Sequence, residues 1–189
     1  GVLMSLSTVE VLSQAQADPR RVPASVPWQW VEQNKILLDG RPMDFLNHPY
    51  QLALLSENFT EECDKKGAQM GFTSARMLNT IHGHIYAKYP QGTLYLFPTR
   101  GDVTDFSKGR FGPLINDNPC LQQHIQDTDA ANIKRIRGTM LYFRGTNSRS
   151  QLKSVPVDQI IFDEIDEMSP DMVQLALARV GHSEVKRIV

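Results

Sequence analysis

The sequence lacks the features that mark several classes of protein. Its only two cysteines, Cys63 and Cys120, are too far apart to form a metal-ligand pair, which is typical of a reducing cytoplasm. No apolar run is long enough to cross a membrane. There is also no internal repeat and no low-complexity tract. These absences favour a soluble, intracellular protein with an ordinary globular core.

The chain also lacks an excess of positive charge. Its 189 residues carry a formal net charge of −1, whereas a protein that coats DNA is usually much more basic. Any contact with DNA must therefore be local, transient, or made by residues outside this chain. The hydrophobic share of 41% is enough for one core.

Proline and arginine divide the N-terminal part from the rest. The mixed helical spacing of residues 2–16 ends at the Pro- and Arg-containing stretch 18–23. We therefore interpret residues 1–41 as an arm or linker and 42–189 as the folded domain. Trp28 and Trp30 would attach the arm to the core, although binding of a partner is an alternative.

From residue 44 onward, helical and extended patterns alternate. We expect helices over 46–55, 73–88, 102–115 and 171–179, with another starting within 119–126, and strands over 59–63, 93–97, 133–136, 140–143 and 159–162. This order predicts an α/β fold with a mainly parallel sheet and helices on both faces. His82 and His84 lack further ligands at a suitable spacing, so we assign them to a helix surface and not to a metal site.

A glycine-containing loop precedes the helix expected at 73–88. A strand, such a loop and a helix start form an anion site, because backbone N–H groups and the positive end of the helix dipole point at a phosphate. Gly71 and Thr73 fit a P-loop, in which the hydroxyl binds magnesium, but Phe72 stands where the usual lysine would be. Taken alone, the segment is better described as an ordinary strand-to-helix turn. Lys66, at the front of the loop, changes that balance because it could fold back toward the phosphates.

Two carboxylates follow the apolar strand expected at 159–162, about 90 residues after the loop. In an open α/β sheet, the carboxyl end of such a strand lies beside the phosphate loop. Asp163 would then hold magnesium, and Glu164 would act as the general base toward water. The alternative is that Asp163, Glu164, Asp166 and Glu167 form a solvated acidic turn.

Taken together, these segments resemble the ATPase domain of phage terminase large subunits of the lambda-like, GpA type. The run 66–71, with its lysine at the front, is similar to that family's variant phosphate loop. The segments 95–100, 105–106, 113–115, 138–148 and 152–158 resemble its second strand and helix and the region before its acidic strand. The resemblance covers about 42–179, and the order and spacing of the pieces carry it.

The resemblance implies a P-loop NTPase of the RecA/ASCE type that uses ATP and Mg²⁺. Its nucleotide-binding residues would be Gln51, Lys66, Gly67, Ala68, Gln69, Met70, Gly71, Phe72, Thr73 and Ser74. Lys66 and Glu164 would be catalytic, and Thr73 and Asp163 would bind the metal. Gln51 is similar to the adenine-reading glutamine of related motors, with Tyr50 along the base, although a surface glutamine is the alternative.

In such ring motors a neighbouring subunit supplies a cation, for which Arg144, Arg149 and Lys153 are candidates, as they also are for DNA contacts. The implied partners are double-stranded DNA, the portal protein, the small terminase subunit and identical copies in a ring, with no membrane. The implied location is the cytoplasm of the infected or prophage-carrying bacterial host, on the procapsid portal.

The resemblance also predicts that the chain is a fragment that lacks the nuclease domain and ends as a further strand begins at about residue 186. In related ATPase folds that strand inserts between the acidic strand and the P-loop strand. Two other functions remain open. One is a helicase-like, nucleic-acid-stimulated ATPase, which would normally keep the lysine that Phe72 replaces. The other is a non-hydrolysing module with a degenerate nucleotide site that docks on DNA or portal.

Overall fold

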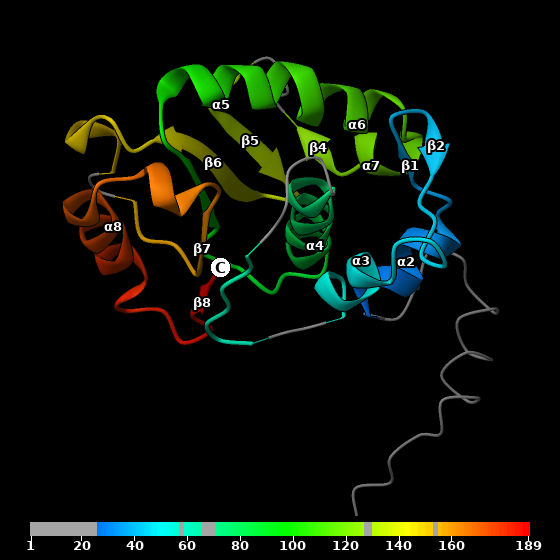
Figure 1. Cartoon of the computed structure of the whole chain (residues 1–189), viewed down its shortest axis with the longest axis horizontal. Helices are drawn as coiled ribbons and strands as arrows, with labels where there is room; N and C mark the ends of the chain where they lie inside the picture. Colours follow the sequence, from blue (N-terminus) through cyan, green and yellow to red (C-terminus); the bar gives the residue numbers. More distant parts are fainter. Residues whose placement is uncertain (1–25, 57–58, 66–70, 127–129, 153–154) are drawn as a thin grey trace, which may run out of the picture.

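The computed structural model describes residues 26–56, 59–65, 71–126, 130–152 and 155–189 (Figure 1). The strands are β1 Leu37–Leu38, β2 Arg41–Pro42, β3 Thr93–Phe97, β4 Ile125–Gln126, β5 Ile133–Ile136, β6 Thr139–Gly145, β7 Gln159–Phe162 and β8 Arg187–Ile188. The α-helices are α2 Pro27–Gln33, α3 Pro49–Leu54, α4 Phe72–Ile85, α5 Arg100–Phe106, α6 Gly112–Asn116, α7 Pro119–Gln122 and α8 Pro170–Leu177. A π-turn, Ser107–Phe111, joins α5 to α6, and 3₁₀ turns occupy Arg149–Leu152, Ile165–Glu167 and Ala178–Val180.

The main sheet has the strand order β4-β5-β6-β3-β7-β8. β3 pairs in parallel with both β6 and β7, and β7 pairs in parallel with β8, while β5 is antiparallel to both of its neighbours, β4 and β6. The expected α/β class, the mostly parallel sheet and the 133–143 hairpin are confirmed.

β8 lies between the acidic strand β7 and the segment that leads into the glycine-containing loop. Glu61 forms a parallel bridge with Ile188, whose N–H donates to the carbonyl of Thr60 at 2.8 Å. The expected insertion of this strand is therefore confirmed. The strand expected over 59–63 is wrong in extent, because only Glu61 has strand pairing there and the side chains that follow are held by ion pairs described below.

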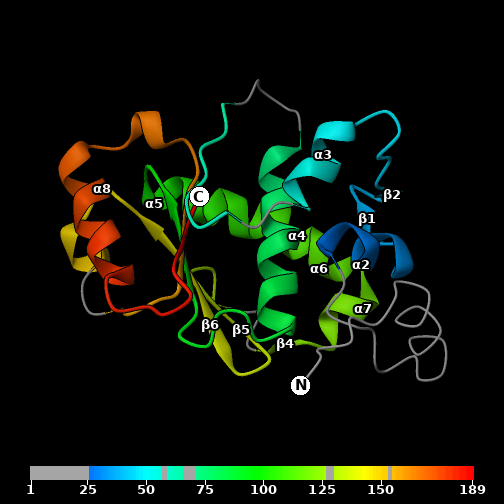
Figure 2. The same ribbon diagram turned by 90° about the horizontal axis from the view of Figure 1, so that it is seen from below.

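The two faces of β3 bury two separate cores. Because side chains alternate along a strand, Tyr95 and Phe97 enter one core and Leu94 and Leu96 enter the other. The first core includes residues of α2, α3, α4, α5 and α6, and the second includes residues of α8. Figure 2 shows α2, α4 and α6 on one side of the strands and α8 on the other. Helices thus cover both faces, as the sequence predicts.

α4 is the helix that follows the glycine-containing loop, and it is buried along most of its length. Met77, Leu78 and Ile81 face the first core. The assignment of His82 and His84 to a helix surface is wrong, since their exposed fractions are 0% and 1%. His84 is accommodated because its two ring nitrogens lie 2.6 Å from the Thr139 hydroxyl and 2.9 Å from the Thr93 hydroxyl.

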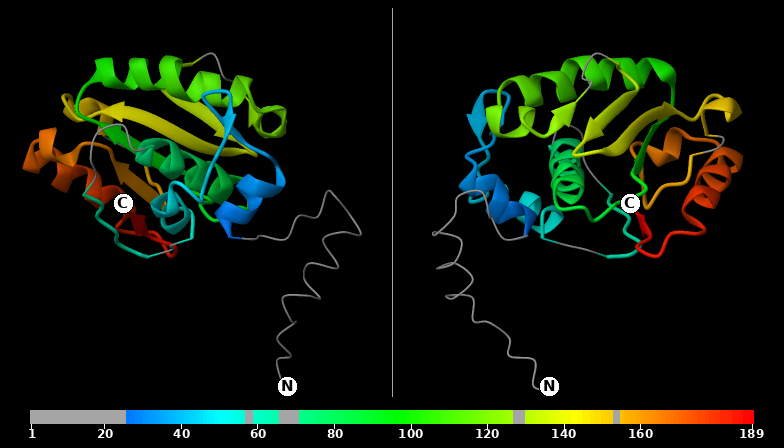
Figure 3. Two further views of the ribbon diagram at one scale, coloured as in Figure 1. Left: turned by 45° about the vertical axis from the view of Figure 1, so that its right-hand side comes forward. Right: turned by 180° about the vertical axis from the view of Figure 1, so that it is seen from behind.

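The helix expected at 102–115 starts two residues earlier and is not α-helical along its whole length. Thr99 and Asp102 form a capping box, which places the first helical residue at Arg100. The π-turn then interrupts the α-helical hydrogen bonding before α6. Figure 3 shows the stretch from α5 to α6 running along β5 and β6. The helix expected within 119–126 ends at Gln122, and β4 follows.

Part of the segment interpreted as an arm packs into the first core. Trp30, Val31 and Ile36 are nearly fully buried, and Trp28 packs against the same core. This agrees with the expectation that Trp28 and Trp30 attach the segment to the core. The division at residue 41 remains a prediction, and residues 1–25 lie outside the described part of the chain.

Candidate functional site

The carboxyl ends of β3, β6 and β7 lie at one edge of the sheet because these strands are parallel. The backbone crosses closely there, since a Cβ on Gly145 would lie 2.6 Å from the backbone of Thr99 and Arg100. Such an edge is where open α/β sheets bind ligands. The residues singled out from the sequence are placed relative to it in the following paragraphs.

The start of α4 is the described part of the predicted phosphate loop. Gly71 has φ 73°, a left-handed conformation that favours glycine, and Thr73 and Ser74 lie in the first turn. The predicted loop residues Lys66, Gly67, Ala68, Gln69 and Met70 lie outside the described residues. The first N–H groups of a helix and the positive end of its dipole suit a phosphate.

Gln51 lies against the start of α4. It is 9% exposed, so it is buried and not on the surface, and its Nε2 lies 2.7 Å from the point where a Cβ on Gly71 would stand. Phe72, in the place of the usual lysine, stacks on Tyr50 with ring centroids 5.4 Å apart. The structure therefore brings Gln51 and Tyr50 together with residues 71 and 72.

Asp163 and Glu164 directly follow β7. The Asp163 amide donates to the Leu96 carbonyl at 2.9 Å, which ties the turn to β3. The Tyr95 hydroxyl donates to the Asp163 carboxylate at 3.4 Å, and burial, followed by the charge of Asp163, raises the pKa of Tyr95 well above its usual value. Glu164 is exposed and left-handed, with φ 62° and ψ 50°. A strained non-glycine residue at this edge is typical of a functional site.

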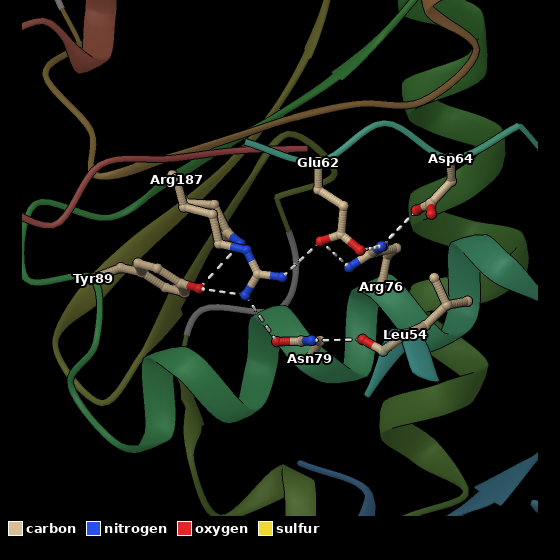
Figure 4. Close-up of polar contacts among 8 residues, drawn as sticks. Leu54, Glu62, Asp64, Arg76, Asn79, Tyr89 and Arg187 are labelled. Carbon is tan, nitrogen blue, oxygen red and sulfur yellow. Dashed lines mark hydrogen bonds and ion pairs between the residues drawn. The ribbon is translucent and has the colours of Figure 1, made fainter. Parts of the chain in front are cut away.

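A buried ionic network joins the approach to the loop, α4 and β8 (Figure 4). The Arg76 guanidinium pairs with Glu62, and its Nε donates to Asp64 at 3.1 Å. The Arg187 guanidinium donates to Glu62 at 3.3 Å and to the Tyr89 hydroxyl at 3.2 Å. The side chains of Glu62, Arg76 and Arg187 are each 6% exposed. The positive charges of the two arginines neutralise the negative charges of the acids. The acids therefore do not repel an anion from the start of α4.

Sequence reasoning missed this network. Its signal was the acidic residue Glu62 in a segment expected to be a buried strand, because a buried carboxylate needs a cationic partner. Arg76 and Arg187 were the available cations on neighbouring elements, but the chain separates them by 111 positions (187 minus 76). The pairing of Arg187 with Glu62 follows from β8 lying beside residue 61, and that of Arg76 from α4 packing beside the same segment.

A cavity of about 400 Å³ adjoins the start of α4. Gly71, Ser74 and Met77 form its α4 wall, and the opposite wall comes from the α5–α6 stretch, including Phe106 and Arg110. Its lining therefore combines apolar side chains with a helix start and one guanidinium, a composition typical of ligand sites.

Comparison with known proteins decides the family. The sequence model of the family described as "Phage terminase large subunit gpA, ATPase domain" matches residues 43–183. The chain belongs to this family.

One solved structure also resembles this terminase ATPase domain. It is the large terminase from a thermophilic bacteriophage, with 17% sequence identity and a TM-score of 0.43. The match covers 59% of this chain and 29% of the chain in that structure. No curated protein sequence matches. Within the described residues, no helix is long and apolar enough to cross a membrane.

Two residues of this terminase domain, Thr73 on α4 and Asp163 after β7, carry oxygen groups of the kind that Mg²⁺ prefers. The Thr73 hydroxyl and the Asp163 carboxylate are hard oxygen ligands, and Mg²⁺ beside a nucleotide needs only one or two protein ligands. In the described ranges, no group of three or more His, Cys, Asp or Glu side chains could hold a metal ion by itself.

The three candidate cations of the terminase domain differ in their surroundings. Arg144 donates to the carbonyls of Asn132 at 2.8 Å and Phe143 at 3.1 Å, and burial lowers its pKa. Arg149 is exposed in the 3₁₀ turn after β6. Lys153 lies outside the described residues. Of the two described candidates, Arg149 is the one with an exposed side chain.

Proposed function

We propose that this chain is the ATP-hydrolysing motor domain of a phage terminase large subunit, which drives double-stranded viral DNA into the procapsid. The observation that carries the proposal is the placement of Asp163 and Glu164 at the carboxyl edge of β7, in a chain whose family is a terminase ATPase domain. Gly71 starts the helix that follows the predicted phosphate loop in the same domain.

In this proposal the start of α4 binds the phosphates of ATP. Backbone N–H groups of the loop 66–74 and the Lys66 ammonium contact the phosphate oxygens. The Gln51 amide reads the adenine edge, and Tyr50 lies along the base. Thr73 and Asp163 hold Mg²⁺, which neutralises charge on the phosphates when bound.

Glu164 orients a water molecule for in-line attack on the γ-phosphorus and accepts its proton. The new P–O bond forms as the bond to the β,γ-bridging oxygen breaks, and ADP and inorganic phosphate leave. The exposure of Glu164 is consistent with access to water. Arg149, or Arg144 or Lys153, acts from a neighbouring subunit on the transition-state charge.

The intact motor would be a ring of identical subunits on the portal, in the cytoplasm of the infected host. Its partners would be double-stranded DNA, the portal protein and the small terminase subunit. The net charge of −1 agrees with local contacts to DNA, made in turn by the subunits of a ring.

The proposal is tested by titrating the 189-residue chain with a fluorescent ATP analogue and Mg²⁺. Binding should saturate, and Lys66→Ala should weaken it by more than about tenfold, because a charged phosphate contact is lost. Lys65→Ala is the matched control, since Lys65 is an exposed lysine one position away. Its affinity should stay within about twofold of the unaltered chain.

The other outcomes discriminate between functions. Equal binding by the unaltered chain and Lys66→Ala removes Lys66 from the site. Absence of binding to the unaltered, folded chain contradicts a working nucleotide site and favours the docking module with a degenerate site. Nucleotide binding with hydrolysis stimulated by single-stranded nucleic acid would instead favour the helicase-like function.

A further inference from the structure

Arg110 occupies a position that the proposed roles above leave unused. It lines the cavity of about 400 Å³ opposite Gly71 and Ser74, the residues at the start of α4. Its side chain is exposed, so the guanidinium is accessible to a ligand. In the described chain, Asp39 is the other charged residue on this lining. One positive side chain thus shares a cavity with the positive end of a helix, which favours an anion between them.

The backbone that carries Arg110 is a π-turn held by aromatic packing. Phe106, just before the turn, lies 4.9 Å from Phe97 between ring centroids, and Phe111, its last residue, lies 5.4 Å from Phe143. Both Phe106 and Phe111 are buried. A π-turn inserts one residue into an α-helix and often occurs at functional sites. The exposed guanidinium therefore projects from a rigidly anchored backbone.

The charge of Arg110 also acts on the region of the acidic pair. Tyr95 donates to Asp163; burial and the charge of Asp163 raise the pKa of Tyr95, whereas the charge of Arg76 and, to a smaller extent, that of Arg110 lower it. Arg110 is thus near enough to influence the hydroxyl that contacts Asp163. Arg110 thus lines the cavity at the start of α4, and its charge reaches Tyr95, the residue that donates to Asp163.

We propose that Arg110 binds the terminal phosphate of ATP from within the same subunit. This inference rests on the proposed ATPase function and adds a residue that distinguishes a nucleoside triphosphate from a diphosphate. A guanidinium presents a planar fork of N–H donors that matches two phosphate oxygens. It differs from Arg144, Arg149 and Lys153, which are candidates to act on a neighbouring subunit.

The test compares the affinities of Arg110→Ala for Mg-ATP and Mg-ADP analogues with those of the unaltered chain. Affinity for the triphosphate should fall by about tenfold or more, and affinity for the diphosphate should change by less than about twofold. Lys108→Ala is the matched control, because Lys108 is an exposed cation of the same π-turn that lies on a different cavity. Its affinities should match those of the unaltered chain.

Three results would overturn the inference. An unchanged triphosphate affinity in Arg110→Ala, or an equal loss for both nucleotides, removes the contact with the terminal phosphate. If Lys66→Ala abolishes binding while Arg110→Ala does not alter it, the ATPase proposal stands and the role of Arg110 falls. If the unaltered chain binds neither nucleotide, both proposals fall. A melting temperature like that of Lys108→Ala shows that Arg110→Ala is folded.

Discussion

Gly71 carries two separate constraints at the scale of a single residue. Its φ of 73° is strained for any side chain, and the Gln51 amide occupies the space that a Cβ would enter. Gly40 has nearly the same φ, 72°, but nothing within 4 Å of a Cβ. The two glycines therefore separate backbone strain from the contact with Gln51.

We predict that Gly71→Ala and Gly40→Ala each lower the free energy of unfolding by about 1–2 kcal/mol, because both force alanine into the left-handed region. Only Gly71→Ala should weaken nucleotide binding, since the end of the flexible Gln51 side chain must move away. Urea unfolding and titration with a fluorescent ATP analogue measure the two effects. Equal nucleotide affinities in the two variants would contradict a role for Gln51 beside the loop.

The sequence predicts which residues lie at this site better than it predicts their backbone conformation and burial. Asp163 and Glu164 were placed after a strand because an apolar run ends there, and β7 confirms that strand. The left-handed backbone of Glu164 was not predictable, because it depends on how the turn is tied to β3. The burial of Gln51 likewise depends on α3 packing against α4, which no local pattern reveals.

At the scale of elements, buried ion pairs hold the segment that precedes the loop against α4. The segment before the loop has one strand bridge, at Glu61, and is otherwise held by Glu62 and Asp64 through Arg76 of α4. Hydropathy predicted a full strand there because it cannot represent long-range ion pairing. By contrast, β3 and the β5–β6 hairpin were predicted well, since β3 is a compact apolar run that is buried along its whole length and the two hairpin strands flank Gly138.

We predict that Arg76→Met lowers the free energy of unfolding by about 3 kcal/mol, because it removes the cation that pairs with Glu62 and Asp64 while the acids remain. Desolvation already opposes the charge on Arg76, and its hydrogen bonds to these acids outweigh that cost and raise its pKa. Urea denaturation measures the change. Arg179→Met is the control, because Arg179 donates only a long 3.5 Å bond to the Leu175 carbonyl.

The double variant Arg76→Met/Glu62→Gln provides the decisive comparison. In Arg76→Met the Glu62 carboxylate keeps Arg187 as a cationic partner but loses Arg76. Removing the charge of Glu62 should therefore recover part of the lost stability, since a buried charge with fewer partners costs free energy. Additive losses in the two single variants and the double variant would show that Arg76 and Glu62 do not interact. The same result would mean that apolar packing holds the segment 61–65.

At the scale of the whole molecule, the polar contacts under α4 extend across the sheet. His84 links α4 to Thr93 on β3 and Thr139 on β6, and Thr93 donates to Gln159 on β7 at 3.1 Å. The stability of the domain is therefore coupled to one histidine of α4 that contacts two strands of the sheet. The sequence suggested a surface position because the His-x-His pair has no further metal ligands at a suitable spacing, and that pattern does not report how α4 packs against the sheet.

We predict that this histidine makes the domain less stable in mild acid. Burial lowers the pKa of His84 to about 4, against 6.5 for the unfolded chain, so the unfolded state binds more protons between these values. Its contribution is complete above pH 6.5 and is lost as the pH falls toward 4, by about 2 kcal/mol between pH 7 and pH 5. His84→Gln should make the free energy of unfolding depend less on pH in this range. His182→Gln, at an exposed position, should leave that pH dependence unchanged. If both variants show the same pH dependence of the free energy of unfolding as the unaltered chain, burial does not lower the pKa of His84.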